Sequence, residues 1–342
     1  MEKKKILWGI ISFIIALLTI WAVMSQSKNA SPAMIWNFIK GSNKVWMLLS
    51  ALSMFGFIWF EGYAIIRIAR SLGYKNTVRQ GTLYGAADVY FSAITPSATG
   101  GQPASAYFMI KDGMPAHATT VVLLINLIMY TLALLTLGIL SIIFFPGFLM
   151  RFSWISKLLI LIGSVVLILL AIAFYFLLRR GEFLRKFCDK LMKILKKFHL
   201  VRYNERRQKK LNDTMEKYQE CSRILVGKRK MLLEVYFWNL MQRLSQFGVS
   251  VCVFMATGAG ALKALKIGVI QCFVSLGSNS VPIPGSMGVA DYIMLDGFKM
   301  IVGEAQPANM ELICRGIAFY GSVITGLLIV IIGYLSRQYK KN

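Results

Sequence analysis

Histidine is nearly absent from this chain of 342 residues, which contains only His117 and His199. Neither lies in a long apolar run, so an intramembrane serine protease would lack the base that activates its nucleophile. The five cysteines show no CxxC spacing, and three of them fall in apolar helical sequence. Neither a disulfide framework nor a zinc site is indicated. We therefore expect no catalytic residue, no metal and no cofactor.

Acidic residues are also scarce, because 15 Asp and Glu stand against 39 Lys and Arg, a net charge of +24. These charges cluster between apolar runs rather than in a soluble domain, which favours anionic lipid over nucleic acid as the partner. Hydrophobic residues make up 56% of the chain, and the mean hydropathy is +0.60. The composition predicts an all-α polytopic membrane protein.

Six apolar runs are long enough to cross about 30 Å of hydrocarbon. They cover residues 6–24, 45–66, 119–145, 155–178, 232–256 and 311–335. The first follows MEKKK but precedes no clear small-residue cleavage site, so we expect an uncleaved span. Two further apolar stretches, 81–110 and 268–299, are broken in the middle into halves of about ten to fifteen residues, too short to cross alone. Each is typical of a re-entrant helical hairpin.

The distribution of Lys and Arg predicts the orientation. With the N-terminus inside, eight of them lie outside and 29 inside, as the positive-inside rule requires. Both termini are then cytoplasmic in a bacterial plasma membrane, and the two hairpins enter from opposite faces. We expect an inverted repeat formed by an N-terminal membrane half (1–178) and a C-terminal half (231–342), although no strong residue-level repeat supports it.

A basic linker, residues 179–230, joins the two halves, with 18 Lys and Arg against 6 Asp and Glu. Its apolar residues recur at helical spacing, which predicts an amphipathic helix on an anionic membrane surface. They are Phe183, Phe187, Leu191, Ile194 and Phe198. For residues 201–230, a solvated linker explains the pattern equally well.

The first break reads TPSATGGQP, residues 95–103. Proline ends one half-helix there and suits the first turn of the next, and the glycines allow backbone N–H groups to approach a ligand. A helix N-terminus offers unpaired N–H donors and a partial positive charge, which together favour an anion. The alternative is a tight turn that only allows close helix packing. The candidate binding residues here are Ser97, Thr99, Gly100, Gly101 and Gln102.

The second break, SNSVPIPGSMG (residues 278–288), repeats this logic. Prolines stop one half-helix, and small residues open the next. Two helix N-termini are therefore predicted to converge on one negatively charged group near the bilayer centre. The candidate binding residues here are Ser280, Gly285, Ser286 and Gly288.

Ionisable side chains within apolar sequence are costly and suggest function. Arg243 lies about halfway along its span and is the first choice for contacting a lipid phosphate. Arg315 lies about a turn inside a span end, where snorkelling competes with a ligand role. Asp88 and Asp291, in the hairpins, are candidates to pair with these arginines, bind a cationic headgroup or exchange protons. Glu61 is expected to face the surface at the cytoplasmic end of its span.

The two broken motifs resemble a known family. TPSATGGQPASAYFMIKDG matches a PSxxGG-type loop before a short helix and a basic-glycine turn, and VPIPGSMGVAD matches PxPGGxGxxE. In these features the chain resembles the transmembrane family named after bacterial lysylphosphatidylglycerol synthase, over nearly its whole length. Ser286 replaces the usual second glycine, and Asp291 stands where glutamate is more common. Either departure would alter headgroup choice.

The resemblance implies a lipid-translocating domain, which in multidomain members moves aminoacylated phosphatidylglycerol outward and lowers susceptibility to cationic antimicrobial peptides. Those members carry the transferase in a separate soluble domain that we do not expect here, so a transporter is favoured over an enzyme even where family naming says phosphatidylglycerol lysyltransferase. Two alternatives stay open: a non-transporting accessory subunit of a lipid synthase, and a polyprenyl-phosphate carrier. The expected partners are an anionic or aminoacylated phospholipid, the membrane, a separate synthase and a second copy of the chain.

Overall fold

The computed structural model describes residues 32–95, 98–179, 205–279, 286, 288–303 and 307–339, and the described elements are helices without a strand. The predicted first span (6–24) and the amphipathic segment 183–198 lie outside these ranges. The helices are α2 (Pro32–Gly41), α3 (Lys44–Ser71), α4 (Val78–Ile94), α5 (Gly101–Lys111), α6 (Ala116–Phe144), α7 (Pro146–Arg151), α8 (Trp154–Arg179), α10 (Glu205–Gly227), α11 (Arg229–Ala256), α12 (Ala261–Ser278), α13 (Val289–Val302), α14 (Pro307–Arg315), the π-helical η3 (Gly316–Tyr320) and α15 (Gly321–Tyr339).

Five helical segments of the described chain are long and apolar enough to cross a membrane. Four of them agree with predicted spans, and the fifth is α12, which the sequence assigned to half of a hairpin. α12 has 18 residues and begins at Ala261, seven residues before the predicted start. α11 is not among the five although it has 28 residues, because polar side chains along its length lower its hydropathy.

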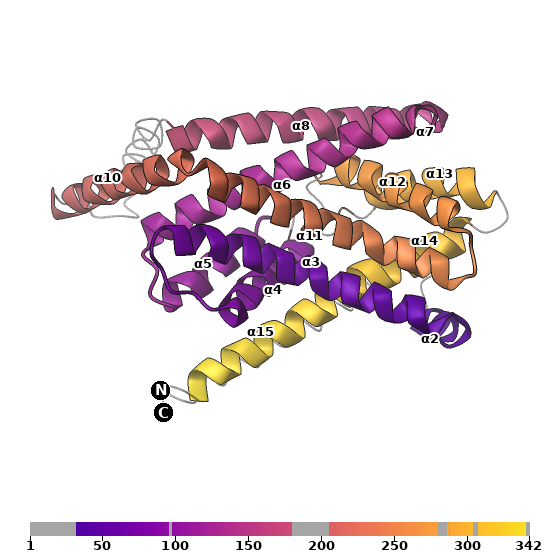
Figure 1. The fold of residues 1–342 in the computed structure, drawn as a ribbon, viewed down its shortest axis with the longest axis horizontal. Coiled ribbons are helices and arrows are strands. Elements are labelled where there is room, and N and C mark those ends of the chain that lie inside the picture. Colours follow the sequence, from indigo (N-terminus) through magenta and orange to yellow (C-terminus); the bar gives the residue numbers. More distant parts are fainter. Residues whose placement is uncertain are drawn as a thin grey trace, which may run out of the picture.

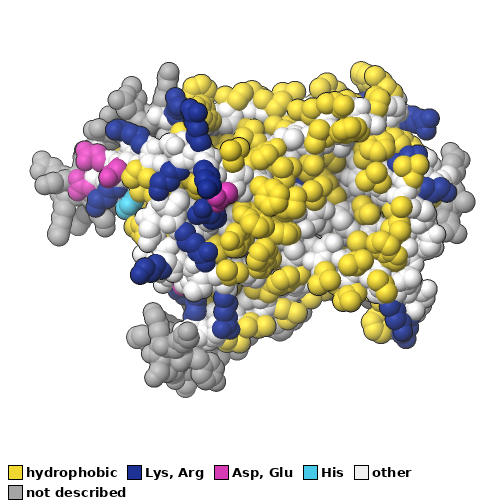
Figure 2. Space-filling view, viewed as in Figure 1, with side chains coloured by type: hydrophobic (Ala, Val, Ile, Leu, Met, Phe, Trp, Pro, Cys, Tyr) yellow, Lys and Arg dark blue, Asp and Glu magenta, His cyan; other side chains and the backbone are white. Residues whose placement is uncertain are grey.

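The two broken stretches each form a pair of packed helices, α4 with α5 and α12 with α13. The first pair lies toward the end of the molecule that carries α10, called here the α10 end, and the second toward the opposite end (Figure 1). Apolar side chains cover the middle of the molecule, and Lys and Arg gather at the α10 end (Figure 2). This distribution is typical of a membrane protein whose charged ends lie in water.

Small residues bring α3 and α4 close together. A Cβ added to Gly62 would lie 2.0 Å from the carbonyl oxygen of Gly81, closer than atoms can approach. Membrane helices often pack through such small residues, because lipid supplies no hydrophobic force between them. The close contact fixes the position of α4 on α3.

α10 is a 23-residue helix that packs against α6 and α8. Its Tyr218 is 1% exposed, and its hydroxyl donates a hydrogen bond of 3.2 Å to the Leu177 carbonyl oxygen. Burial raises the pKa of Tyr218 to about 12. The Ser222 hydroxyl donates to the Leu178 carbonyl oxygen at 2.6 Å. A fully solvated linker is therefore wrong for residues 205–227.

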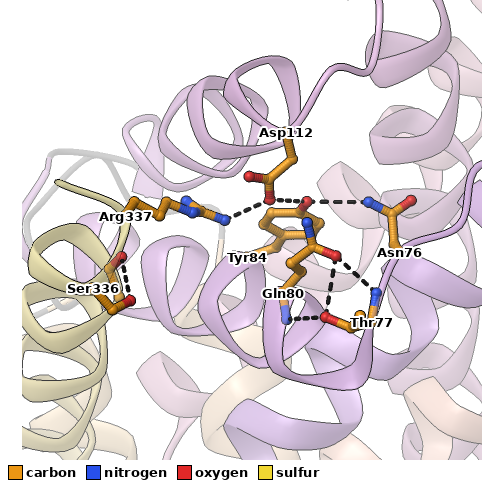
Figure 3. Close-up of polar contacts among 8 residues, drawn as sticks. Asn76, Thr77, Gln80, Tyr84, Asp112, Ser336 and Arg337 are labelled. Carbon is orange, nitrogen blue, oxygen red and sulfur yellow. Dashed lines mark hydrogen bonds and ion pairs between the residues drawn. The ribbon is translucent and has the colours of Figure 1, made fainter. Parts of the chain in front are cut away.

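A polar cluster at the α10 end fastens the first helix pair to α15 (Figure 3). One carboxylate oxygen of Asp112 accepts hydrogen bonds from Arg337 and from the Tyr84 hydroxyl, each at 2.5 Å. Asn76 donates to the Tyr84 oxygen at 3.2 Å. Thr77 and Gln80 close the N-terminus of α4 with a capping box. The turn after α5, the body of α4 and the end of the chain thus hold one another in place.

Candidate functional site

A cavity of about 530 Å³ lies between two buried cores of the bundle. One core is formed mainly by α3, α4, α6 and the start of α11, and the other by α8, α12, α13 and the end of α11. Both helix pairs contribute to the cavity wall, together with α3, α6, α8, α11, α14, η3 and α15. The volume is in the range of small-molecule sites and large enough for a lipid headgroup.

The cavity unites residues from both halves of the sequence. Six of the predicted site residues line it: Asp88, Thr99, Gln102, Arg243, Ser286 and Arg315. Gly100, Gly101, Gly288 and Asp291 lie in the adjoining helix ends and do not line the wall. Ser97, Ser280 and Gly285 lie outside the described residues.

Arg243 is the main cation of the cavity wall. Its side chain projects from the middle of α11 and is 2% exposed. One guanidinium nitrogen donates to the Gln246 amide oxygen at 2.6 Å, and the Tyr130 ring centroid lies 3.9 Å from the guanidinium carbon. The Nε atom has no hydrogen-bond partner among the described residues. A buried donor without a partner costs free energy, so a hydrogen-bond acceptor that reached the Nε atom would stabilise the site.

Asp88, on α4, is held by the first helix pair. Its carboxylate accepts a hydrogen bond of 3.0 Å from the Gln102 amide, at the start of α5, and one of 3.2 Å from the Ser92 hydroxyl. Gly101 allows this approach, since a Cβ there would lie 2.0 Å from both Asp88 Oδ1 and Ser92 Oγ. Close packing is thus the function of this glycine in the described structure.

The prediction that Glu61 faces the surface is wrong. Glu61 is 3% exposed and lines the cavity. Asn126 of α6 donates to one carboxylate oxygen at 2.6 Å, and Gln242 of α11 donates to the other. Asn239 extends the network by donating to the Asn126 amide oxygen at 3.1 Å. α11 packs along much of α3 and turns Glu61 inward, away from lipid.

A sequence signal for this network exists. Asn239, Gln242, Arg243 and Gln246 recur three and four residues apart in α11, so they share one helix face. A polar stripe in an otherwise apolar helix predicts a cavity or a polar partner on that side. Glu61 is the acidic residue of α3 available to meet it.

The second helix pair is joined to α6 at the cavity wall. The Asn279 amide donates to the Tyr130 hydroxyl oxygen at 3.0 Å, and the Ser286 hydroxyl donates to the Ser278 carbonyl oxygen at 2.7 Å. Ser286 has a φ of 51°, in the left-handed region that glycine favours. Ala98, in the first break, has a φ of 53°. Both breaks thus place strained backbone at the cavity wall, which is common at functional sites.

Two backbone N–H groups predicted to meet an anion have partners within the chain. The Gly100 N–H donates to Thr95 Oγ1 at 2.8 Å, and the Gly288 N–H donates to Asp291 Oδ2 at 2.8 Å. The Gly100 N–H is thus bound to the C-cap residue of α4, whereas the Gly288 N–H caps its own helix, α13. These two N–H groups are therefore not available to a ligand in the cavity, whereas side chains on its wall are.

The far side of the cavity carries Arg315, the last residue of α14. Its Nε lies 2.6 Å from Asp291 Oδ1, so the predicted pairing of these two residues is present. Glu311, one turn earlier on α14, is 4% exposed. The π-helical segment Gly316–Tyr320 follows directly. Short π segments in longer helices are frequent at functional sites, and nothing in the sequence signals this one.

The family model for the lysylphosphatidylglycerol synthase TM region matches residues 9–326. The chain belongs to this family. A UPF0104 membrane protein from Archaeoglobus fulgidus is 22% identical over 324 residues, which cover 92% of this chain and 94% of that protein. No solved structure matches the chain. Membership of the lysylphosphatidylglycerol synthase TM family and the apolar helices are consistent with a membrane role in lipid handling.

In this member of the lysylphosphatidylglycerol synthase TM family, the cavity presents two arginines, the carboxyl groups of Glu61 and Asp88, several uncharged donors and apolar side chains of α8, among them Leu167 and Leu170. Such a wall suits a molecule with a charged part and an apolar part. The outward face of α8 is apolar and exposed, with Leu161 61% and Leu169 59% accessible.

Proposed function

We propose that the protein is a lipid translocase that moves a phosphate-bearing lipid between the two leaflets of the cell membrane. The observation that carries this is the position of Arg243, buried in a polar cavity lined by both helix pairs, with no hydrogen-bond partner for its Nε atom among the described residues. A phosphodiester supplies the missing acceptor and neutralises the charge. The substrate class fits an anionic or aminoacylated phospholipid such as phosphatidylglycerol.

The proposed topology has six crossings and two re-entrant hairpins, α4 with α5 and α12 with α13, entering from opposite faces as an inverted repeat. Their locations at opposite ends of the bundle support it (Figure 1). The basic α10 end faces the cytoplasm under the positive-inside rule, with both termini on that side. Rocking of one half against the other would expose the cavity to each leaflet in turn.

The test uses purified protein in phosphatidylglycerol-containing vesicles with a fluorescent phosphatidylglycerol in both leaflets. Dithionite quenches the outer-leaflet label, so further quenching reports transfer from the inner leaflet. Arg243→Ala is expected to slow transfer about 30-fold or more, since losing one partner of a buried charge pair costs about 2–5 kcal/mol. Arg243→Lys is expected to retain part of the activity.

The matched control is Arg67→Ala, because Arg67 pairs with Glu234 at 2.5 Å outside the cavity and both side chains are 33% exposed. Unchanged transfer by a folded Arg243→Ala protein would remove Arg243 from the site. Wild-type protein that moves no label would contradict translocation and leave the accessory-subunit alternative. Labelled lysyl-phosphatidylglycerol and polyprenyl phosphate, run in parallel, distinguish the headgroups.

A further inference from the structure

Glu61 and Asp88 form a pair of buried carboxyl groups. Their side chains are 3% and 8% exposed, on neighbouring helices α3 and α4. Both residues line the same cavity, on packed helices. Two like charges buried in one low-dielectric site are costly, which favours the protonated form of one of the two groups. Asn126 and Gln242 donate to the two oxygens of Glu61, and Gln102 and Ser92 donate to those of Asp88, which holds both groups in place.

Arg243 is a cation on the same cavity wall as both carboxyl groups, and Gln242, its neighbour on α11, donates to Glu61. With one proton on the pair, the cluster of Arg243, Glu61 and Asp88 is neutral, as a low-dielectric site demands. The described cavity wall has three other charged or titratable groups, Tyr130 of α6 and Cys314 and Arg315 of α14. The α5 and α15 helices contribute Gln102 and Ser322, which do not titrate.

The second half of the chain repeats the arrangement with different residues. Arg315 pairs with Asp291, and the buried Glu311 lies one turn before Arg315 on α14. Here too, one arginine lies near two carboxyl groups. The pattern thus occurs once beside each helix pair.

We propose that the cavity couples headgroup binding to proton uptake. When an anionic phosphate pairs with Arg243, it replaces the Glu61–Asp88 pair as the counter-ion of the arginine, and the pair takes up one proton from water. The inference rests on the proposed translocase function. The charges balance at each stage. The empty cluster holds +1 from arginine and −1 from the singly protonated pair. The loaded cluster holds +1 from arginine, −1 from the phosphate and a neutral, doubly protonated pair.

The consequence is electroneutral movement of one anionic lipid with one proton in the same direction. Reconstituted full-length protein in vesicles with an imposed pH gradient, acidic outside, tests it with fluorescent phosphatidylglycerol. At steady state the label is expected to accumulate in the inner leaflet about tenfold per unit of pH gradient, because one proton contributes that factor. Protein-free vesicles give the background. Wild-type protein that transfers label without gradient-driven accumulation overturns the coupling and leaves the translocase intact.

Glu61→Gln keeps the side-chain shape and removes one titrating group. This variant is expected to show no accumulation of label driven by the pH gradient, whether or not it still transfers label down its concentration gradient. The matched control is Glu234→Gln, which neutralises a carboxylate at the Arg67 ion pair outside the cavity and is expected to accumulate label as the wild type does. Accumulation at the wild-type level by Glu61→Gln overturns the proposal.

Calorimetry separates the coupling from transport itself. Dihexanoyl phosphatidylglycerol is titrated into wild-type protein at one pH, in two buffers with different ionisation enthalpies. The difference in heat gives the protons taken up, expected to be about one per headgroup. Heat of binding that does not depend on the buffer overturns the coupling even if the vesicles show no transfer.

Discussion

Gly101→Ala offers a sharp test of how the first helix pair supports the cavity. A Cβ at this position would lie 2.0 Å from Asp88 Oδ1 and Ser92 Oγ and 2.6 Å from the Asp88 carbonyl oxygen. The side-chain atoms can rotate away, but the carbonyl oxygen belongs to the backbone of α4. α4 and α5 must therefore separate by about 1 Å, and overpacking of this kind costs about 1–3 kcal/mol.

The expected result is a lower melting temperature in detergent and slower lipid transfer, because the separation also stretches the 3.0 Å hydrogen bond from Gln102 to Asp88. A loss of 1 kcal/mol lowers Tm by roughly 2–4 °C in a domain of this order of size. Gly147→Ala is the matched control, since nothing lies within 4 Å of a Cβ at that glycine. If both variants melt and transfer lipid alike, the packing of α5 against Asp88 is refuted.

Three further perturbations follow from the polar contacts. Arg337→Gln is expected to lower stability by about 1 kcal/mol, because it weakens a partly exposed ion pair to Asp112; thermal melting measures this, and an unchanged Tm would contradict it. Asn126→Ala leaves a buried Glu61 oxygen without its donor and should cost about 1–3 kcal/mol, detectable in the same melt. Tyr218→Phe removes the bond from α10 to the Leu177 carbonyl, and protease nicking within α10 should become faster.

Much of the membrane architecture is readable from the sequence. Long apolar runs can be recognised without knowing what they pack against, because length and hydropathy alone decide whether a helix can cross the bilayer. The helices α3, α6 and α8 fall where these runs predict. The breaks in the two helix pairs are likewise marked by proline and glycine, whose backbone preferences are local. Lining residues such as Gln102 and Ser286 follow from those breaks.

The direction of a charged side chain is not local. In an apolar helix the lipid-facing and protein-facing sides look alike, so the position of Glu61 within α3 does not by itself show which side it faces. The polar stripe of α11 turns it inward, and that contact joins residues far apart in the chain, such as Glu61 and Gln242.

The sequence by itself determined the class of the protein, the apolar helices, the position of the two breaks and Arg243 as the buried cation, because hydropathy, proline, glycine and charge act over a few residues. The tertiary structure alone decided that Glu61 lies in the cavity, that Gly101 packs on Asp88 and that the N–H groups of Gly100 and Gly288 bind Thr95 and Asp291. Those features depend on which helix faces come together, and helix packing within an apolar environment is set by shape and hydrogen bonding between distant segments.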